Sequence, residues 1–98
     1  MFNIFGLVKL LINKKSKNKN RATELYRHYG LFGNLLYIGI SYNSKTRFKQ
    51  HLITSQWAKK RCWSSVERYP TREKALAAER LAIIKEKPEY NIAHNGNA

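Results

Sequence analysis

Aspartate is absent from this chain of 98 residues, and all six of its acidic residues are glutamates. Enzymes with two catalytic metal ions usually gather several carboxylates, so this shortage disfavours a two-metal site and leaves room for one metal held by one carboxylate. Cysteine is also scarce. Cys62 alone can form neither an internal disulfide nor a thiolate-rich zinc site, so we expect a protein of the reducing cytoplasm. We expect Cys62 itself to be a small core residue of a strand.

The sequence has no apolar run long enough to cross a bilayer. Residues 1–12 are apolar but too short to span it, and they lack the basic region and cleavage site of a signal peptide. We therefore expect no transmembrane segment. Asn3 and Lys9 interrupt the run, which predicts an amphipathic segment that docks on the domain, pairs two subunits as a homodimer or lies at a membrane surface.

Positive charge, in contrast, is abundant. Nineteen lysines and arginines against six acids give a net charge of +13, which favours a polyphosphate or an anionic membrane as partner. Residues 13–21 carry five positive charges and no negative one, and read as either a nucleic-acid-binding arm or a solvated linker. The candidate phosphate-binding residues are Lys14, Lys15, Lys17, Lys19, Arg21, Lys45, Lys59, Lys60 and Arg61.

The remaining pattern predicts one domain, residues 22–98, after the N-terminal segment and arm of residues 1–21. Strand-forming residues and turn signals predict strands at 22–29, 35–41 and 62–69, and capping residues predict helices at 43–54 and 71–85. The fold class is then α+β, with a three-stranded antiparallel sheet flanked by helices. Phe48 and Leu52 are expected to face the core, as is at least one of Trp57 and Trp63, although these rings could also stack on bases.

Glu79 interrupts the apolar stripe of the second predicted helix. Its neighbours at three and four residues include Ala75, Leu76, Ala82 and Ile83, so a helix that buries them also aims the carboxylate inward. A buried carboxylate is tolerated when it is protonated, paired with a cation or bound to a metal. The alternative is a glutamate at the edge of the stripe that reaches water or pairs with Arg47.

The order of motifs resembles that of the GIY-YIG nuclease superfamily over about residues 23–91. The second motif of that family is present as Tyr37-Ile38-Gly39, its arginine as Arg47, and its helix glutamate as Glu79. His51 stands where members place a His or Tyr, and residues 88–91, Pro-Glu-Tyr-Asn, look like the family's P-x-Y-N ending. The first motif departs from the family, because it reads Glu24-Leu25-Tyr26 in place of Gly-Ile-Tyr.

The resemblance implies an endonuclease that hydrolyses phosphodiester bonds, with DNA favoured over RNA. It implies that Glu79 holds one Mg²⁺ or Mn²⁺ and that Arg47 contacts the phosphoryl oxygens, a contact that suits a forked guanidinium. Tyr37 would be the base or position the water, with its pKa lowered by Arg47 and the metal. The resemblance also implies roles for three further residues. Tyr26 would orient a water molecule or an oxygen ligand, and His51 would relay a proton or contact the phosphate. Asn91 would form a hydrogen bond with the substrate or with a tyrosine hydroxyl.

Two other functions remain open from the sequence. A catalytically inactive nucleic-acid-binding module could keep the fold and the positive surface, and the substitution at Glu24 is compatible with it. The membrane-surface alternative depends on the first 20 residues. His28 and His94 have no evident partner in the sequence pattern, so core or surface roles are expected for both.

Overall fold

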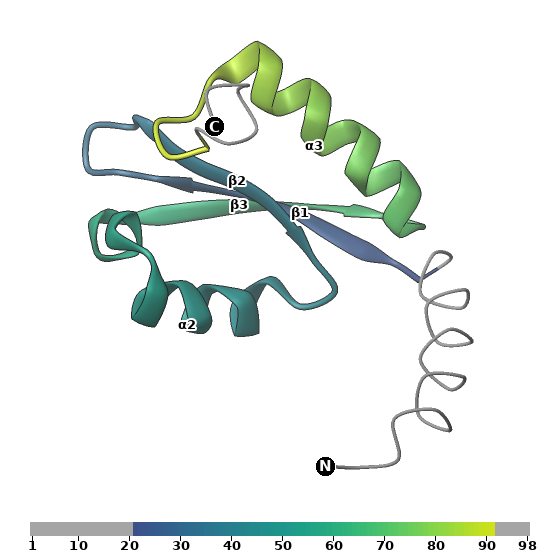
Figure 1. Cartoon of the computed structure of the whole chain (residues 1–98), viewed down its shortest axis with the longest axis horizontal. Helices are drawn as coiled ribbons and strands as arrows, with labels where there is room; N and C mark the ends of the chain where they lie inside the picture. The colour runs from purple at the N-terminus through teal and green to yellow at the C-terminus, as the bar shows by residue number, and fades with distance from the viewer. Residues whose placement is uncertain (1–20, 92–98) are drawn as a thin grey trace, which may run out of the picture.

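The computed structural model describes residues 21–91, which form a three-stranded antiparallel sheet with one helix on each face (Figure 1). The α+β class expected from the sequence is confirmed. Residues 1–20, with the apolar segment and most of the basic arm, lie outside the described part of the chain. In chain order the elements are β1 (Thr23–Tyr29), β2 (Leu35–Ser41), α2 (Ser44–Thr54), the 3₁₀ helix η1 (Gln56–Lys60), β3 (Trp63–Tyr69) and α3 (Arg72–Glu86).

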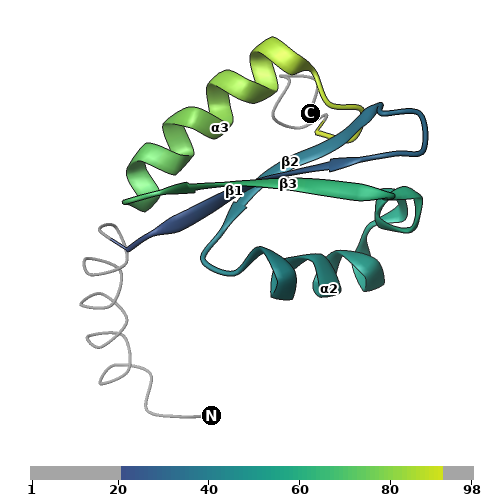
Figure 2. The ribbon, with the colours of Figure 1, turned by 180° about the vertical axis from the view of Figure 1, so that it is seen from behind.

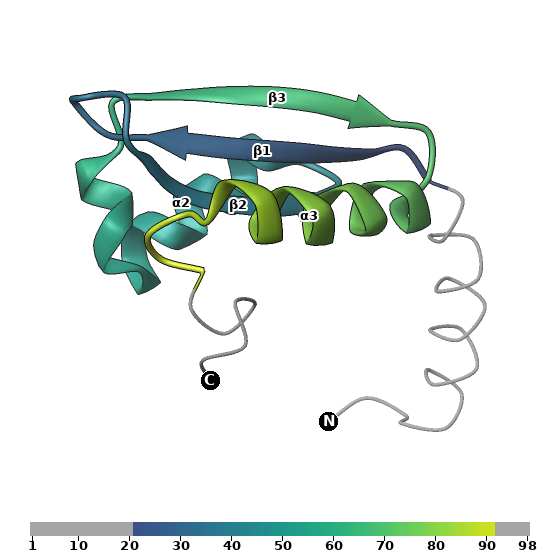
Figure 3. The same ribbon diagram turned by 90° about the horizontal axis from the view of Figure 1, so that it is seen from above.

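The sheet has the strand order β2-β1-β3, with β1 in the centre (Figure 3). Residues that pair across β1 and β2 share a face, so Tyr26 lies opposite Gly39 and His28 lies opposite Tyr37. The register shifts at the end of β1, where Leu36 is the additional residue of a bulge. This shift sends Leu35 toward α3 and Leu36 toward α2.

One face of the sheet, here called the α3 face, packs against α3 (Figure 2). Its centre is an apolar cluster of Leu25, Ile38, Ala82 and Ile83. At its rim Arg27 donates two hydrogen bonds to Glu86 at 2.9 and 2.7 Å. The predicted apolar stripe of this helix is therefore confirmed, and apolar burial holds α3 in place.

The opposite face, here called the α2 face, is covered by α2 and η1 and is rich in aromatic and polar side chains. Leu36, Trp57 and Ala58 form a small buried cluster with the partly buried Phe48 beside it. The prediction that at least one tryptophan is buried is confirmed, because Trp57 is 4% exposed. Trp63, on β3, remains about half exposed.

Side-chain caps fix both helices where the sequence predicts them to begin. The Asn43 side chain accepts from the backbone of Thr46, and that of Thr71 accepts from the backbone of Lys74. After α3, Lys87 takes a left-handed conformation, and the chain returns along the free edge of β2 with Tyr90 N donating to Leu36 O at 2.9 Å. The C-terminal segment thus returns to the sheet.

Two local expectations are wrong, and one element was not expected. Cys62 is exposed and precedes β3, because its backbone N–H bonds to Tyr29 O at the turn into the strand. Leu52 is 42% exposed, because α2 presents His51 to the sheet instead. Helix η1, which buries Trp57, had no counterpart in the predicted elements.

No helix among residues 21–91 is long and apolar enough to span a membrane.

Candidate functional site

Tyr26, Tyr37 and His51 meet on the α2 face. The Tyr26 hydroxyl lies 3.1 Å from His51 Nε2, and both side chains are almost fully buried. The Tyr37 ring stacks near Tyr26 with centroids 6.2 Å apart and meets the edge of His51 at 5.0 Å. Three sequence-predicted site residues from β1, β2 and α2 are therefore brought together by the fold.

Gly39 makes room for this cluster. It lies directly opposite Tyr26 in the β1–β2 register. A Cβ atom at position 39 would overlap the Tyr26 phenol, with Cζ only 2.5 Å away. A glycine two residues after Tyr37 is therefore required for the Tyr26 hydroxyl to reach His51.

His51 is held from both ring nitrogens. Its Nδ1 lies 3.0 Å from the hydroxyl of Ser55, the residue that caps α2, while its Nε2 faces Tyr26. Trp57 packs against the ring at 4.6 Å between centroids. Burial, and to a smaller extent the charge of Arg47, lower the pKa of His51 to about 4, so the imidazole is neutral at physiological pH. A neutral imidazole can accept a proton.

The protein's own groups raise the pKa values of the two tyrosines, whereas the lowered value expected for Tyr37 also depends on a metal. Burial is the largest cause in both, and the negative charge of Glu79 adds to the rise. The charge of Arg47 lowers both values, and a hydrogen bond from its guanidinium lowers that of Tyr26 further, but these effects are smaller than desolvation. Both phenols are therefore neutral, and either can donate its hydroxyl proton but neither is a free base.

Glu79 and Arg47 bring opposite charges to this cluster. Glu79 is 7% exposed on α3, which confirms its inward direction and excludes the alternative in which it reaches open water. Its charge acts on Tyr26 and Tyr37, which places the carboxylate within electrostatic range of both. Arg47 is exposed on α2, where its guanidinium also donates to Gln50 at 2.8 Å. A buried anion and an exposed cation thus flank the Tyr26 hydroxyl.

Asn91 lies next to the site and holds strand β2 through its side chain. Its side-chain amide accepts from Ile38 N at 2.9 Å and donates to Ile38 O at 2.8 Å. These bonds occupy the oxygen and the nitrogen of the buried Asn91 amide and fix the strand beside Tyr37. Asn91 is a positioning residue in this geometry.

Glu24, the departure in the first motif, supports the first turn of α2. Its Oε1 accepts from Ser44 N at 2.7 Å, and Arg68 lies 3.9 Å from its other oxygen. The backbone hydrogen bond from Ser44 is the main cause of the lowered pKa of Glu24. The carboxylate is thus accommodated in a regular strand, at the helix end that favours negative charge.

The predicted phosphate-binding cations of the described residues have different surroundings. Lys45 and Arg61 line a cavity beside Tyr26, whereas Lys60 donates to the Tyr90 hydroxyl at 2.7 Å and Lys59 is exposed on η1. Arg21 lies over the Tyr42 ring at 4.4 Å. The four lysines of the arm, at positions 14, 15, 17 and 19, lie outside the described residues.

The sequence reasoning missed His28 and Ser55. His28 is two residues from Tyr26 on the same face of β1, and its ring centroid lies 4.9 Å from that of Tyr26. Strand alternation could have placed it there. Ser55 follows His51 by four residues, a helical spacing that could have paired them.

A divalent metal at this site would have one carboxylate ligand. Among residues 21–91 no group of three histidine, cysteine or acidic side chains lies close enough to hold an ion. The buried Glu79 carboxylate, whose charge acts on Tyr26 and Tyr37, offers hard oxygen donors of the kind that Mg²⁺ or Mn²⁺ binds while keeping several waters. This donor set does not fit zinc in a closed structural site.

Comparison of the chain with protein-family models, with curated proteins and with solved structures found no match.

Proposed function

We propose that the protein is a metal-dependent endonuclease that hydrolyses phosphodiester bonds of nucleic acid, with DNA as the favoured substrate. The observation that carries this proposal is the convergence on the Tyr26 hydroxyl of three ionisable groups from two helices: His51 at 3.1 Å, the charge of Arg47, and the charge of buried Glu79. The resemblance of these motifs to GIY-YIG nucleases supports the same reaction class. Clusters of titratable groups with shifted pKa values are typical of catalytic sites.

Each side chain has a place in such a reaction. Arg47, exposed and permanently charged, binds the nonbridging phosphoryl oxygens in a forked contact that strengthens as charge develops there. Glu79 would hold the metal, which supplies polarisation of the phosphate when bound. Tyr37, with a raised pKa, keeps its hydroxyl proton and orients the attacking water by hydrogen bonding.

The Tyr26–His51 pair provides a route for the proton. In one tautomer Ser55 Oγ accepts from His51 Nδ1–H, and Nε2 then accepts from the Tyr26 hydroxyl. When water attacks phosphorus, Tyr26 takes the water proton as it passes its own proton to His51 Nε2. The new bond joins water oxygen to phosphorus, and the bond to the leaving sugar oxygen breaks. The leaving oxygen takes up a proton from solvent, and His51 returns its proton to solvent before the next turnover.

The test is incubation of the full chain with plasmid, single-stranded DNA and structured RNA in Mg²⁺, in Mn²⁺ and in EDTA. The proposal expects cleavage in at least one metal, with DNA cut faster than RNA, and none in EDTA. Binding without cleavage under every condition would overturn the enzymatic proposal and favour the inactive binding module. Equal cleavage in EDTA would overturn the role of the metal.

A further inference from the structure

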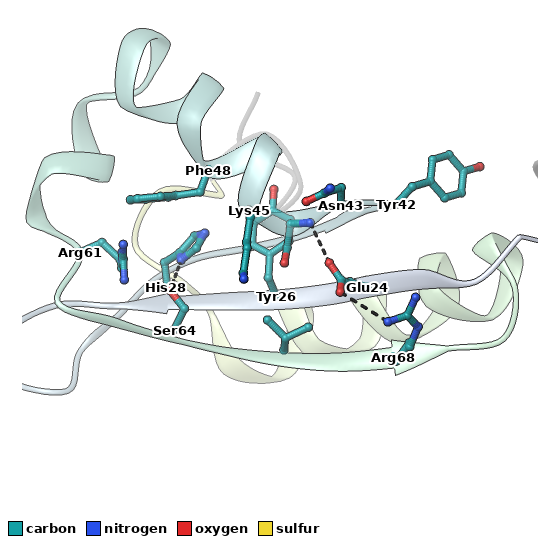
Figure 4. Close-up of a pocket in the computed structure, with 12 residues that line it drawn as sticks. Glu24, Tyr26, His28, Tyr42, Asn43, Lys45, Phe48, Arg61, Ser64 and Arg68 are labelled. Atoms are coloured by element: carbon teal, nitrogen blue, oxygen red, sulfur yellow. Dashed lines mark hydrogen bonds and ion pairs between the residues drawn. The ribbon is translucent and has the colours of Figure 1, made fainter.

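A cavity of about 590 Å³ lies between the first half of α2 and strands β1 and β3 (Figure 4). Tyr26 forms part of its wall, whereas Tyr37, Arg47 and Glu79 do not line it. The cavity therefore adjoins the candidate site through Tyr26 but is a separate compartment. No role assigned above uses it.

The charge of its lining is predominantly positive. Lys45, Arg61 and Arg68 line it, and within residues 21–91 Glu24 is the one carboxylate that lines it. Glu24 already accepts from Ser44 N at 2.7 Å and has Arg68 3.9 Å from its other oxygen. Figure 4 places this pair at one end of the cavity and Arg61 at the other. At the Arg61 end, therefore, no lining carboxylate of the described residues neutralises the positive charge. This end of the cavity suits an anion.

Two lining residues of the cavity carry buried nitrogen atoms without a hydrogen-bond partner. Within residues 21–91 these atoms are Arg61 Nε and His28 Nε2. Arginine nitrogens can only donate, so Arg61 Nε requires an acceptor. The Phe48 ring holds the guanidinium at 4.2 Å, and His28, 3% exposed, is fixed by Ser64 Oγ at 2.6 Å from its Nδ1. An unsatisfied buried donor is costly, and a phosphate oxygen would satisfy it after a small side-chain shift.

The size and the apolar part of the wall favour more than an inorganic anion. Cavities of roughly 300–1,000 Å³ hold small organic ligands, and this volume lies within that range. Phe48, Tyr26 and Val66 add aromatic and apolar surface beside the cations. A phosphate joined to a planar base would use both kinds of wall, whereas free phosphate would use only the cations.

We infer that this cavity holds one unpaired nucleotide of a nucleic-acid strand, with its phosphate at Arg61 and Lys45 and its base against the apolar wall. A cavity of this size between a helix and a sheet matches one nucleotide better than a base pair, so the nucleotide it holds is unpaired or turned out of a duplex. This inference rests on the proposed function in one respect, since the adjoining Tyr26 places the nucleotide next to the bond to be cut. The preferred substrate is then single-stranded, bulged or frayed.

The first experiment measures binding of dTMP to the full chain by calorimetry in EDTA, where cleavage plays no part. Lys45→Gln and Arg61→Gln should each weaken binding about tenfold or more, and Lys49→Gln, an exposed cation on the same helix outside the cavity, should not change it. Lys45 is exposed, so its variant tests the cavity even if Arg61→Gln impairs folding. Absent dTMP binding, inorganic phosphate binding as tightly as dTMP, or equal loss in Lys49→Gln would each overturn the inference.

The second experiment compares a perfect duplex, the same duplex with one bulged nucleotide, and the single strand. Wild-type protein should bind the bulged and single-stranded forms at least tenfold more tightly than the duplex, and Lys45→Gln should reduce that preference. Equal affinity for the three would contradict an unpaired nucleotide. Nucleotide binding without cleavage would refute the proposed nuclease activity but support the cavity as a nucleotide site. Cleavage without nucleotide binding would support the nuclease activity but refute the cavity as a nucleotide site.

Discussion

The two faces of the sheet bury side chains of different character. On the α3 face, Leu25, Ile38 and Ile83 form an apolar cluster, and α3 adds an ion pair only at the rim. On the α2 face, Tyr26, His28 and His51 are as deeply buried, although each carries polar atoms. Burial of apolar groups stabilises the fold, whereas burial of titratable groups disfavours their charged forms. The difference indicates that apolar burial on the α3 face stabilises the fold, whereas the α2 face carries most of the titratable groups of the proposed site, to which α3 contributes Glu79.

The largest expected effect on stability comes from the α3 face. Ile83→Ala removes most of a fully buried side chain, so the free energy of unfolding should fall by about 2–5 kcal/mol. Ile84→Ala, on the same helix but 67% exposed, should change it by about 0.5 kcal/mol or less. Urea denaturation followed by circular dichroism measures both. Similar losses in the two variants would contradict the assignment of the core to this face.

On the α2 face, Arg47→Lys should lower the cleavage rate by about 100-fold or more, because an ammonium cannot reproduce a forked contact with two phosphoryl oxygens. Stability should change little, since Arg47 is exposed. Arg80→Lys, an exposed arginine on α3, is the matched control and should cleave at the wild-type rate. A fully active Arg47→Lys protein would reduce the residue to general electrostatic attraction.

Acid should destabilise the protein through the buried histidines. The folded-state pKa values of His28 and His51 are about 4, below the usual 6.5. As the pH falls from 6.5 toward 4, these histidines therefore become protonated in the unfolded chain but stay neutral in the folded protein. Stability is complete well above pH 6.5, and each of the two histidines should lower it by on the order of 2 kcal/mol by pH 5.

Urea titrations at pH 7.5, 6 and 5 measure this slope, and they stay above the range in which Glu24, with its lowered pKa, contributes. His28→Gln should flatten the slope, because one of the two groups is removed. A stability that is independent of pH across this window would show that these imidazoles are not held neutral by burial.

The smallest expected effect is at the start of α2. Glu24→Ala removes the acceptor of the Ser44 N–H bond and should cost about 1 kcal/mol. Glu24→Gln keeps an acceptor oxygen and should recover part of this loss. Thermal unfolding distinguishes the two variants. Equal destabilisation by both would mean that the negative charge, and not the hydrogen bond, supports the helix.

Local patterns in the sequence were sufficient to predict the three strands and both long helices, and they gave the burial of Glu79 as one of two alternatives. These features depend on periodicity and on capping residues such as Asn43 and Thr71, which act within a few positions along the chain. The bulge at Leu36 and the short helix η1 depend on how distant segments meet, so local patterns did not reveal them.

The same distinction applies to the candidate site. Tyr26, Tyr37 and His51 were predicted from their order along the chain, but the raised pKa of Tyr37 follows from three-dimensional burial. The hydrogen bond from Ser44 N to the Glu24 carboxylate joins residues twenty positions apart. The cavity beside Tyr26 likewise requires β3 to lie across from α2, which no local pattern specifies.

The central claim, that buried Glu79 belongs to a catalytic site, is tested most directly by the rate of nucleic-acid cleavage by Glu79→Gln in Mg²⁺, measured beside Glu73→Gln. Both residues lie on α3, but Glu73 is exposed in the first turn. The account predicts that Glu79→Gln binds nucleic acid with little change yet does not cut it, because it lacks the metal ligand, while Glu73→Gln cuts at the wild-type rate. A folded Glu79→Gln protein that cuts at a rate close to wild type would contradict the account.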